Sequence, residues 1–175
     1  MNQFLLTKAQ KNQVIHQTRH YIELANQQHN LNLTEIKVKF DLKGRTSGMF
    51  MVRNGLTSIR YNEIIFSHYF EDSLINTVAH EVAHYVVHTI WGVKKVKPHG
   101  KEWQQVMLMF DVKPDVTSQY DVSGLPLHRQ TQHDYSCGCM MHQLSTTRHN
   151  KVQKKKAIYK CRKCRLPLRL SSRNI

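Results

Sequence analysis

Residues 77–88 read TVAHEVAHYVVH, and this stretch decides both the local fold and the chemistry of the chain. On a helix, positions four apart stand one turn apart on the same face, so His80 and His84 can point their imidazoles at one metal ion. Glu81 then lies beside the metal, where it can take a proton from a water molecule. The pattern is typical of zinc peptidases.

The residues around this pattern predict a buried helix. Asp72 or Ser73 can cap its start, and Gly92 can end it. Its apolar side chains are Leu74, Ile75, Val78, Ala79, Val82, Ala83, Val86 and Val87. Ionisable groups rarely lie unpaired in a core, and metal ligation would satisfy them. The alternative is a buried helix whose histidines hydrogen-bond to neighbouring residues.

A zinc site needs a third ligand, and His88 and His99 are the candidates. His88 lies further along the same helix, so His80 and His88 would stand about 12 Å apart along its axis, too far to share one tetrahedral ion easily. His99 follows a loop and precedes a second helix that the apolar spacing of residues 103–110 predicts. A ligand from a separate element suits the geometry better. We therefore favour His99 and interpret His88 as a partly buried surface histidine.

All four cysteines lie near the C-terminal end, in two close pairs. Cys137 and Cys139 precede a β-rich interval, and Cys161 and Cys164 follow it, which suits a zinc ribbon with two knuckles joined by a hairpin. The CxC spacing of the first pair is tighter than the usual CxxC, so His142 could replace Cys137 or Cys139 as a ligand. The alternative, a disulfide or free thiols, needs an oxidising compartment.

No segment of the sequence suggests export or membrane insertion. The stretch MNQFLLTKAQKNQ has neither a sustained apolar core nor a small-residue cleavage site. No apolar run approaches the length that spans a bilayer. We therefore expect a cytoplasmic protein that does not bind membranes.

Taken together, these residues resemble the SprT family of zinc metalloproteases, which includes the eukaryotic protease Spartan, and look closest to its bacterial members. HEVAH at 80–84, PHGKEW at 98–103 and the cysteine-containing tail carry the resemblance, which runs through most of the chain. The resemblance implies that His80, His84 and His99 bind a catalytic zinc and that Glu81 is the general base. It also implies a zincin-like domain followed by a zinc ribbon. Residues 154–156 are lysines where family members often have a glycine.

The expected fold is α+β, with residues 1–127 as the zincin-like domain and residues 128–175 as a zinc ribbon with a basic tail. Thr7 and Gln10 can form a capping box for a first helix that ends near Asn30. Strands are predicted at 35–40, 48–52 and 57–62, as a small mixed or antiparallel sheet. Asn54-Gly55 is a strong hairpin signal. Residues 115–131 read as a linker.

Positive charge is concentrated in the C-terminal region. Residues 128–175 hold 12 Lys and Arg and one acid, a net charge of +11 out of +14 for the whole chain. Such a region can bind phosphates, and Tyr135 and Tyr159 could stack on unpaired bases, so we expect DNA, including single-stranded DNA, as a partner. The alternative is a solvated basic face that aids solubility.

These observations favour a monomeric zinc metalloendopeptidase that holds one catalytic and one structural zinc. Its expected substrates are proteins associated with DNA, as the resemblance implies. The group that stabilises the developing oxyanion stays open, with Tyr85 and Tyr120 among the candidates. The alternative function is a non-catalytic nucleic-acid-binding protein in which the ribbon and the basic tail do the work.

Overall fold

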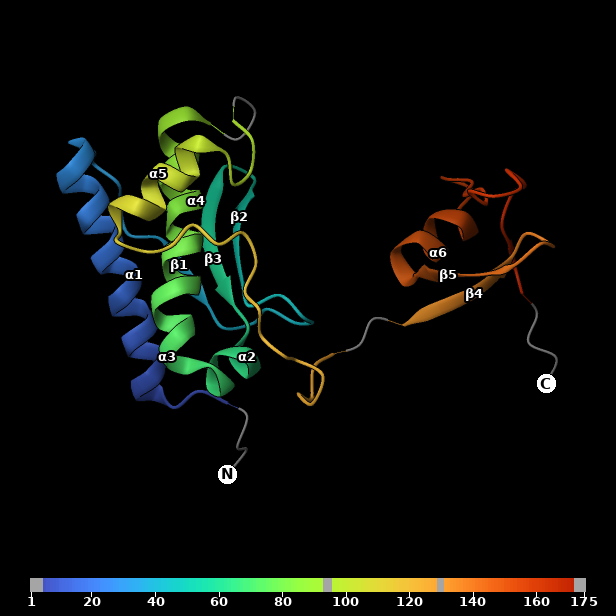
Figure 1. The fold of residues 1–175 in the computed structure, drawn as a ribbon, viewed down its shortest axis with the longest axis horizontal. Coiled ribbons are helices and arrows are strands. Elements are labelled where there is room, and N and C mark those ends of the chain that lie inside the picture. Colours follow the sequence, from blue (N-terminus) through green and yellow to red (C-terminus); the bar gives the residue numbers. More distant parts are fainter. Residues whose placement is uncertain (1–4, 93–95, 129–130, 172–175) are drawn as a thin grey trace. The chain divides into compact units, whose positions relative to one another are not determined.

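The computed structural model describes residues 5–92, 96–128 and 131–171. The chain divides into two compact units, residues 1–128 and residues 129–175 (Figure 1). The first unit combines several helices with a three-stranded sheet, and the described part of the second unit combines one helix with a three-stranded sheet. The fold is therefore mixed α+β, as the sequence predicts.

Helix α4 (Val78–Trp91) lies at the centre of the first unit. Helices α1 (Lys8–His29) and α5 (Lys101–Met109) pack against it, and the sheet contacts it as well (Figure 1). Its fully buried side chains are Val78, Ala79, Val82, Ala83 and Val86. Because close packing surrounds α4, the polar side chains that it carries are held in fixed positions.

Helix α1 begins and ends where its sequence signals place it. The Thr7 hydroxyl accepts a hydrogen bond from Gln10 N–H, and the Gln10 side chain accepts one from Thr7 N–H, which completes the predicted capping box. Asn30 closes the helix in the left-handed conformation, with φ of 47°. The buried face of α1 packs on α4 and consists of Val14, Thr18, Tyr21, Ile22 and Ala25.

The sheet of the first unit contains β1 (Lys37–Lys39), β2 (Gly48–Arg53) and β3 (Leu56–Tyr61) in the order β1-β3-β2. β1 runs parallel to β3, and β2 runs antiparallel to it. Asn54 and Gly55 join β2 to β3 with φ of 52° and 77°, the positive values that a two-residue type I′ turn requires. β2 is an edge strand, and it contacts α4.

The entry into α4 differs from the prediction. After α2 (Glu63–His68), the chain forms α3 (Phe70–Asp72) and then a π-helical turn, η1 (Ser73–Thr77), that continues directly into α4. Asp72 and Ser73 therefore make no side-chain cap for this helix. The Asp72 carboxylate instead accepts hydrogen bonds from the Tyr120 hydroxyl and the Asn76 amide. Gly92 does end the helix, as predicted.

Residues 113–120, here called the strap, overlap residues 115–131, the segment that we interpreted as a linker. The strap has neither helix nor strand, as expected of a linker, but its Tyr120 hydroxyl contacts Ser73 and Thr77 of the first unit. Val112 and Val122 are buried on either side of the strap. The Tyr120 ring stacks on Tyr69, with centroids 4.5 Å apart and planes 8° apart. The Tyr69 hydroxyl also donates to the Asp121 carbonyl at 2.7 Å. The strap is thus fixed to the first unit at both ends.

The second unit is a small β-rich module. β4 (Gln132–Ser136) lies between β5 (Met141–Ser145) and β6 (Arg169–Leu170), and both pairings are antiparallel. Its core is small and consists of Tyr135, Cys137, Leu144, Cys161 and Leu168. A core of this size gives little stability by itself, so a unit like this needs a further constraint such as a metal.

The interval between the two cysteine pairs is only partly the β-rich segment that we expected: residues 143–144 lie in β5, but residues 157–159 form no strand. β5 is followed by helix α6 (Thr146–Gln153), which contacts β4 and β5 (Figure 1). The Tyr135 hydroxyl and His149 Nδ1 lie 3.1 Å apart and tie β4 to this helix. The chain leaves α6 through the lysines, and Lys155 takes a φ of 53°, the conformation that glycine adopts most easily.

Candidate functional site

Three histidines from two parts of the first unit meet at one point. His80 and His84 lie one turn apart on α4, and His99 lies just before Gly100, the N-cap of α5. The Nε2 atoms of His80 and His84 are 3.2 Å apart, those of His84 and His99 are 3.1 Å apart, and those of His99 and His80 are 3.0 Å apart. His88 is not part of this group.

This arrangement fits a zinc ion. Tetrahedral zinc with Zn–N bonds of 2.0–2.1 Å places two imidazole nitrogens about 3.3 Å apart, close to the three observed spacings. Burial, followed by the neighbouring histidines, lowers the pKa of His80 to about 4 and that of His84 to about 3. Burial also lowers the pKa of His99. All three imidazoles are therefore neutral at physiological pH, the form that binds metal.

The Trp103 ring packs against the rings of all three histidines. The sequence predicted Trp103 only as part of an apolar helix face. It is 1% exposed, and its ring centroid lies 4.7 Å from that of His80, 5.8 Å from that of His84 and 4.8 Å from that of His99. Its indole N–H donates to the His80 carbonyl at 3.3 Å. Only the folded arrangement of α4 and α5 reveals this role, because the two helices are separate in sequence.

Glu81 is buried beside the histidines, with 6% of the residue exposed. Its Oε2 accepts a hydrogen bond of 2.5 Å from the backbone N–H of Phe50, on the edge strand β2. Burial raises the pKa of Glu81 to about 7, and the Phe50 N–H opposes that rise. A carboxyl group with a pKa in this range can both accept and release a proton near neutral pH.

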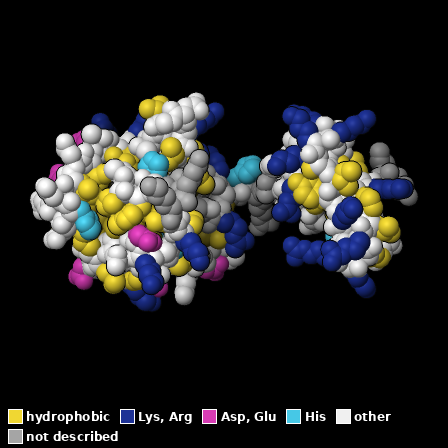
Figure 2. Space-filling model, turned by 90° about the horizontal axis from the view of Figure 1, so that it is seen from above, with side chains coloured by type: hydrophobic (Ala, Val, Ile, Leu, Met, Phe, Trp, Pro, Cys, Tyr) yellow, Lys and Arg dark blue, Asp and Glu magenta, His cyan; other side chains and the backbone are white. Residues whose placement is uncertain are grey.

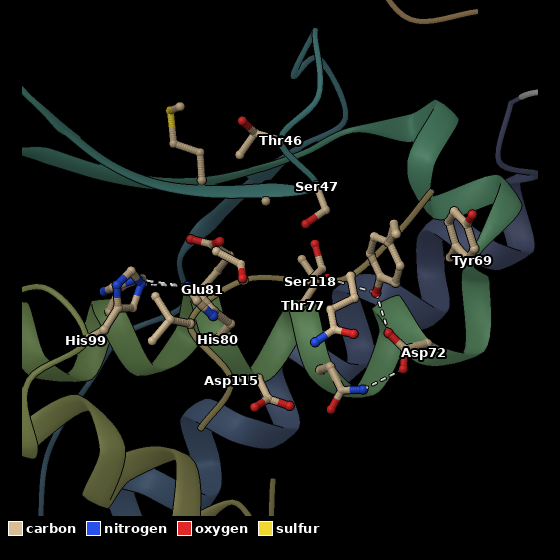
Figure 3. Close-up of a pocket in the computed structure, with 18 of the residues that line it drawn as sticks. Thr46, Ser47, Tyr69, Asp72, Thr77, His80, Glu81, His99, Asp115 and Ser118 are labelled. Atoms are coloured by element: carbon tan, nitrogen blue, oxygen red, sulfur yellow. Dashed lines mark hydrogen bonds between the residues drawn. The ribbon is translucent and has the colours of Figure 1, made fainter. Parts of the chain in front are cut away.

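A cavity of about 1050 Å³ opens over these four residues. Residues 45–50 form one wall, the strap forms another, and α4 with η1 contributes the floor. Figure 3 shows His80, His99 and Glu81 at one end of the cavity and Tyr69 with Asp72 at the other. The cavity is large enough for several residues of an extended peptide beside the three imidazoles.

The two tyrosines that we considered as oxyanion partners both use their hydroxyls elsewhere. Tyr85 is buried and donates to the Thr34 carbonyl at 3.2 Å. Tyr120 lines the cavity, but its hydroxyl donates at 2.5 Å to Oδ2 of Asp72, and Asp72 lies at the end of the cavity away from His99 (Figure 3). Neither hydroxyl is free in this structure to contact a carbonyl held between the histidines.

The second unit gathers the four cysteines into another group. The four sulfurs of Cys137, Cys139, Cys161 and Cys164 all lie within 4.8 Å of one another, and all four residues are free thiols. The Sγ atoms of Cys137 and Cys139 are 3.1 Å apart, and those of Cys139 and Cys161 are 3.8 Å apart. A tetrahedral zinc–sulfur site needs about 3.8 Å, and a disulfide about 2.05 Å. The Cys139–Cys161 distance matches a shared metal ion, and the Cys137–Cys139 distance is shorter than that but well above a disulfide bond length.

His142 lies beside this group as a hydrogen-bond partner. Its Nε2 is 3.4 Å from Cys137 Sγ, and the Cys137 thiol raises the pKa of His142. The backbone N–H of Cys164 lowers the pKa of Cys161, which favours the thiolate form that ligates zinc. The group of side chains that could hold a metal ion here thus consists of the four sulfurs and does not include His142.

Comparison with known proteins identifies the family of this chain. The sequence model described as the SprT-like family matches residues 11–123, a range that includes His80, Glu81, His84 and His99. The chain belongs to the SprT-like family. The resemblance that the sequence motifs suggest is thereby confirmed.

Several curated SprT proteins are similar along most of their length. Protein SprT of Vibrio parahaemolyticus is 35% identical over 148 residues, which cover 84% of this chain and 86% of the relative. Protein SprT of Pasteurella multocida gives the same values. Protein SprT of Glaesserella parasuis is 32% identical over 154 residues, which cover 87% of this chain and 94% of the relative. The search of solved structures found no match.

The structure also bears on membrane association. Among residues 5–92, 96–128 and 131–171, no helix combines the length and apolar character needed to cross a bilayer.

Proposed function

We propose that this SprT-like protein is a zinc metalloendopeptidase with a zincin-like catalytic unit and a zinc ribbon. The observation that carries the proposal is the convergence of His80, His84 and His99 on one point, with Glu81 beside them at the end of a large open cavity. A purely structural zinc site is closed by four protein ligands, whereas a catalytic one keeps a position open. Three imidazoles facing a cavity match the catalytic type.

Each residue of this site has a definite role in the proposed reaction. Bound zinc would supply a Lewis acid that polarises the peptide carbonyl and lowers the pKa of a water molecule. Glu81 takes the proton of the attacking water and later transfers it to the amine that leaves. Trp103 keeps the histidines in place, and the strap and residues 45–50 hold the peptide on either side.

Edge strand β2 is the element that we propose binds the substrate backbone. β1 is the opposite edge of the sheet, and of the three strands only β2 contributes residues to the cavity wall. An extended peptide can add to an exposed edge as a further strand, here through outward backbone groups of β2 other than the Phe50 N–H, which donates to Glu81. This placement favours unfolded or locally extended protein segments as substrates, and the reaction is hydrolysis of an internal peptide bond.

The first experiment compares His99→Ala with His88→Ala. His99→Ala is expected to lose the zinc of the first unit, because two histidines leave the metal under-coordinated. Its peptidase activity on an unfolded protein substrate is expected to fall by about 10²-fold or more. His88→Ala is the matched control and is expected to keep both. Zinc content and cleavage rate are measured on the same samples. Equal activity in the two variants would refute His99 as the third ligand.

We also propose that the ribbon unit binds DNA and brings the peptidase to proteins associated with it. Figure 2 shows Lys and Arg side chains spread over this unit with apolar side chains between them. The exposed apolar residues are Met140, Met141, Ile158, Leu166 and Leu170. Tyr135 is fully buried, so it cannot stack on a base, and Arg148 lies 5.7 Å from the centre of the Tyr159 ring. Phosphate contacts therefore dominate the proposed binding.

A charge variant tests this binding. Changing Lys154, Lys155 and Lys156 to Gln is expected to weaken binding of single-stranded DNA and to reduce the salt dependence of log K by about 2, if all three lysines contact phosphates. The matched control changes three exposed lysines of the first unit, Lys8, Lys37 and Lys43, to Gln. Affinity is measured at several salt concentrations. The same salt slope in the parent and the ribbon variant would rule out these lysines as the DNA contact.

A further inference from the structure

Gly48 is buried at the start of β2, against the side chains of Glu81 and Thr77. A Cβ on its backbone would lie 2.7 Å from both Cγ and Oε1 of Glu81 and 2.8 Å from Cγ2 of Thr77. Non-bonded carbon atoms prefer about 3.5–4.0 Å, so these contacts are severe clashes. Gly48 is not among the residues with positive φ. The position thus needs glycine for the space that Glu81 occupies and not for an unusual backbone conformation.

The backbone at Gly48 cannot easily retreat from Glu81. Gly48 is paired with Tyr61 of β3, which is fully buried. The adjacent Asn62 N–H donates to the Ser47 carbonyl at 2.8 Å. A side chain at position 48 would therefore displace the Glu81 carboxylate and not the strand.

Phe50 completes the contact between β2 and Glu81. Its backbone N–H points away from β3 and donates to Glu81 Oε2 at 2.5 Å. An outward N–H of an edge strand is normally free for another strand or for water. Here it donates to the carboxylate that lies against Gly48. Gly48 and Phe50 therefore both determine the position of the Glu81 carboxylate.

We propose that Gly48 is a positioning residue for the general base. The missing side chain lets the Glu81 carboxylate rest against the edge of β2, where the Phe50 N–H fixes one of its oxygens at the end of the cavity that holds the three histidines. This inference rests on the proposed peptidase function. The residue at position 48 determines where the base lies.

The kinetic test is a double-mutant cycle. Gly48→Ala is expected to lower the turnover number on a peptide substrate by about 100-fold, the scale of a 1 Å misplacement, with zinc content and KM within about twofold of the parent. In a Glu81→Gln background the same change should cost less than about twofold, because no base remains to be misplaced. Gly124→Ala is the matched control, since Gly124 has no atom within 4 Å of an added Cβ and no positive φ. Equal losses in both backgrounds would overturn the inference.

A stability measurement tests the contact between position 48 and the Glu81 side chain independently of activity. Gly48→Ala is expected to lower the melting temperature of the parent by about 4 °C, as for an overpacked site. The drop should be less than half as large in a Glu81→Ala background, which lacks Cγ and Oε1. Adding Thr77→Ser to the Gly48→Ala variant removes the Thr77 Cγ2 atom, and this second change should not restore turnover. An equal drop in both backgrounds would overturn the inference, whereas an inactive parent with unequal drops would refute only the peptidase function.

Discussion

Replacing Glu81 with glutamine is expected to lower peptide hydrolysis by about 10²–10⁴-fold while zinc stays bound. Glutamine has nearly the same shape, and its carbonyl oxygen can still accept the hydrogen bond from Phe50 N–H. It cannot take a proton from water, so only the chemical step should suffer. The three histidines are untouched, and zinc content should equal that of the parent.

The measurement is the turnover number on an unfolded protein substrate, together with zinc per chain. Glu102→Gln is the matched control, because Glu102 is a partly exposed acid in the first turn of α5 and outside the group of metal-ligand candidates. Its activity should match the parent. Cleavage at the normal rate by Glu81→Gln would show that another group acts as the base.

Loss of one ribbon cysteine is expected to unfold the second unit and leave the first unit intact. Cys161 is 1% exposed and belongs to both the small core and the sulfur group. Structural zinc contributes about 10–16 kcal/mol of apparent binding free energy in small zinc-dependent folds, far more than this core can supply alone. Cys161→Ser should therefore release one zinc ion and disorder the hairpin of β4 and β5.

Amide resonances and zinc content measure this outcome together. The ribbon resonances should collapse to unfolded positions, and those of residues 5–128 that the structure describes should persist. Met140→Ser is the control, because Met140 is exposed and adjacent to Cys139. A ribbon that stays folded after losing its zinc would mean that packing alone holds this unit.

Local sequence signals predicted the elements that depend on neighbouring residues. The capping box at Thr7 and the left-handed Asn30 set both ends of α1 through hydrogen bonds within a few residues. Asn54-Gly55 specified a two-residue turn in the same way. The metal-ligand spacing on α4 is also local, since a helix fixes the relation between positions four apart.

Features that depend on distant contacts were missed. The π-helical turn at 73–77 and the hydrogen bonds of Tyr120 arise where the strap meets η1, over 40 residues apart in sequence. Gly48 was predicted only as a turn residue and the first residue of a strand, because its neighbour Glu81 lies 33 positions away in the sequence. Helix α6 has few apolar residues and no buried ones, so its apolar pattern was too weak to predict it.

The most direct test of a catalytic zinc site coupled to a ribbon counts zinc in the parent and in a variant with His80 and His84 both changed to alanine. Both proteins are measured with and without single-stranded DNA, and self-cleavage is followed in the same samples. We expect two zinc ions per chain in the parent and one in the variant, with DNA-stimulated cleavage in the parent only. One zinc ion in both proteins, with no cleavage in either, would contradict this expectation and leave a ribbon-based nucleic-acid-binding protein.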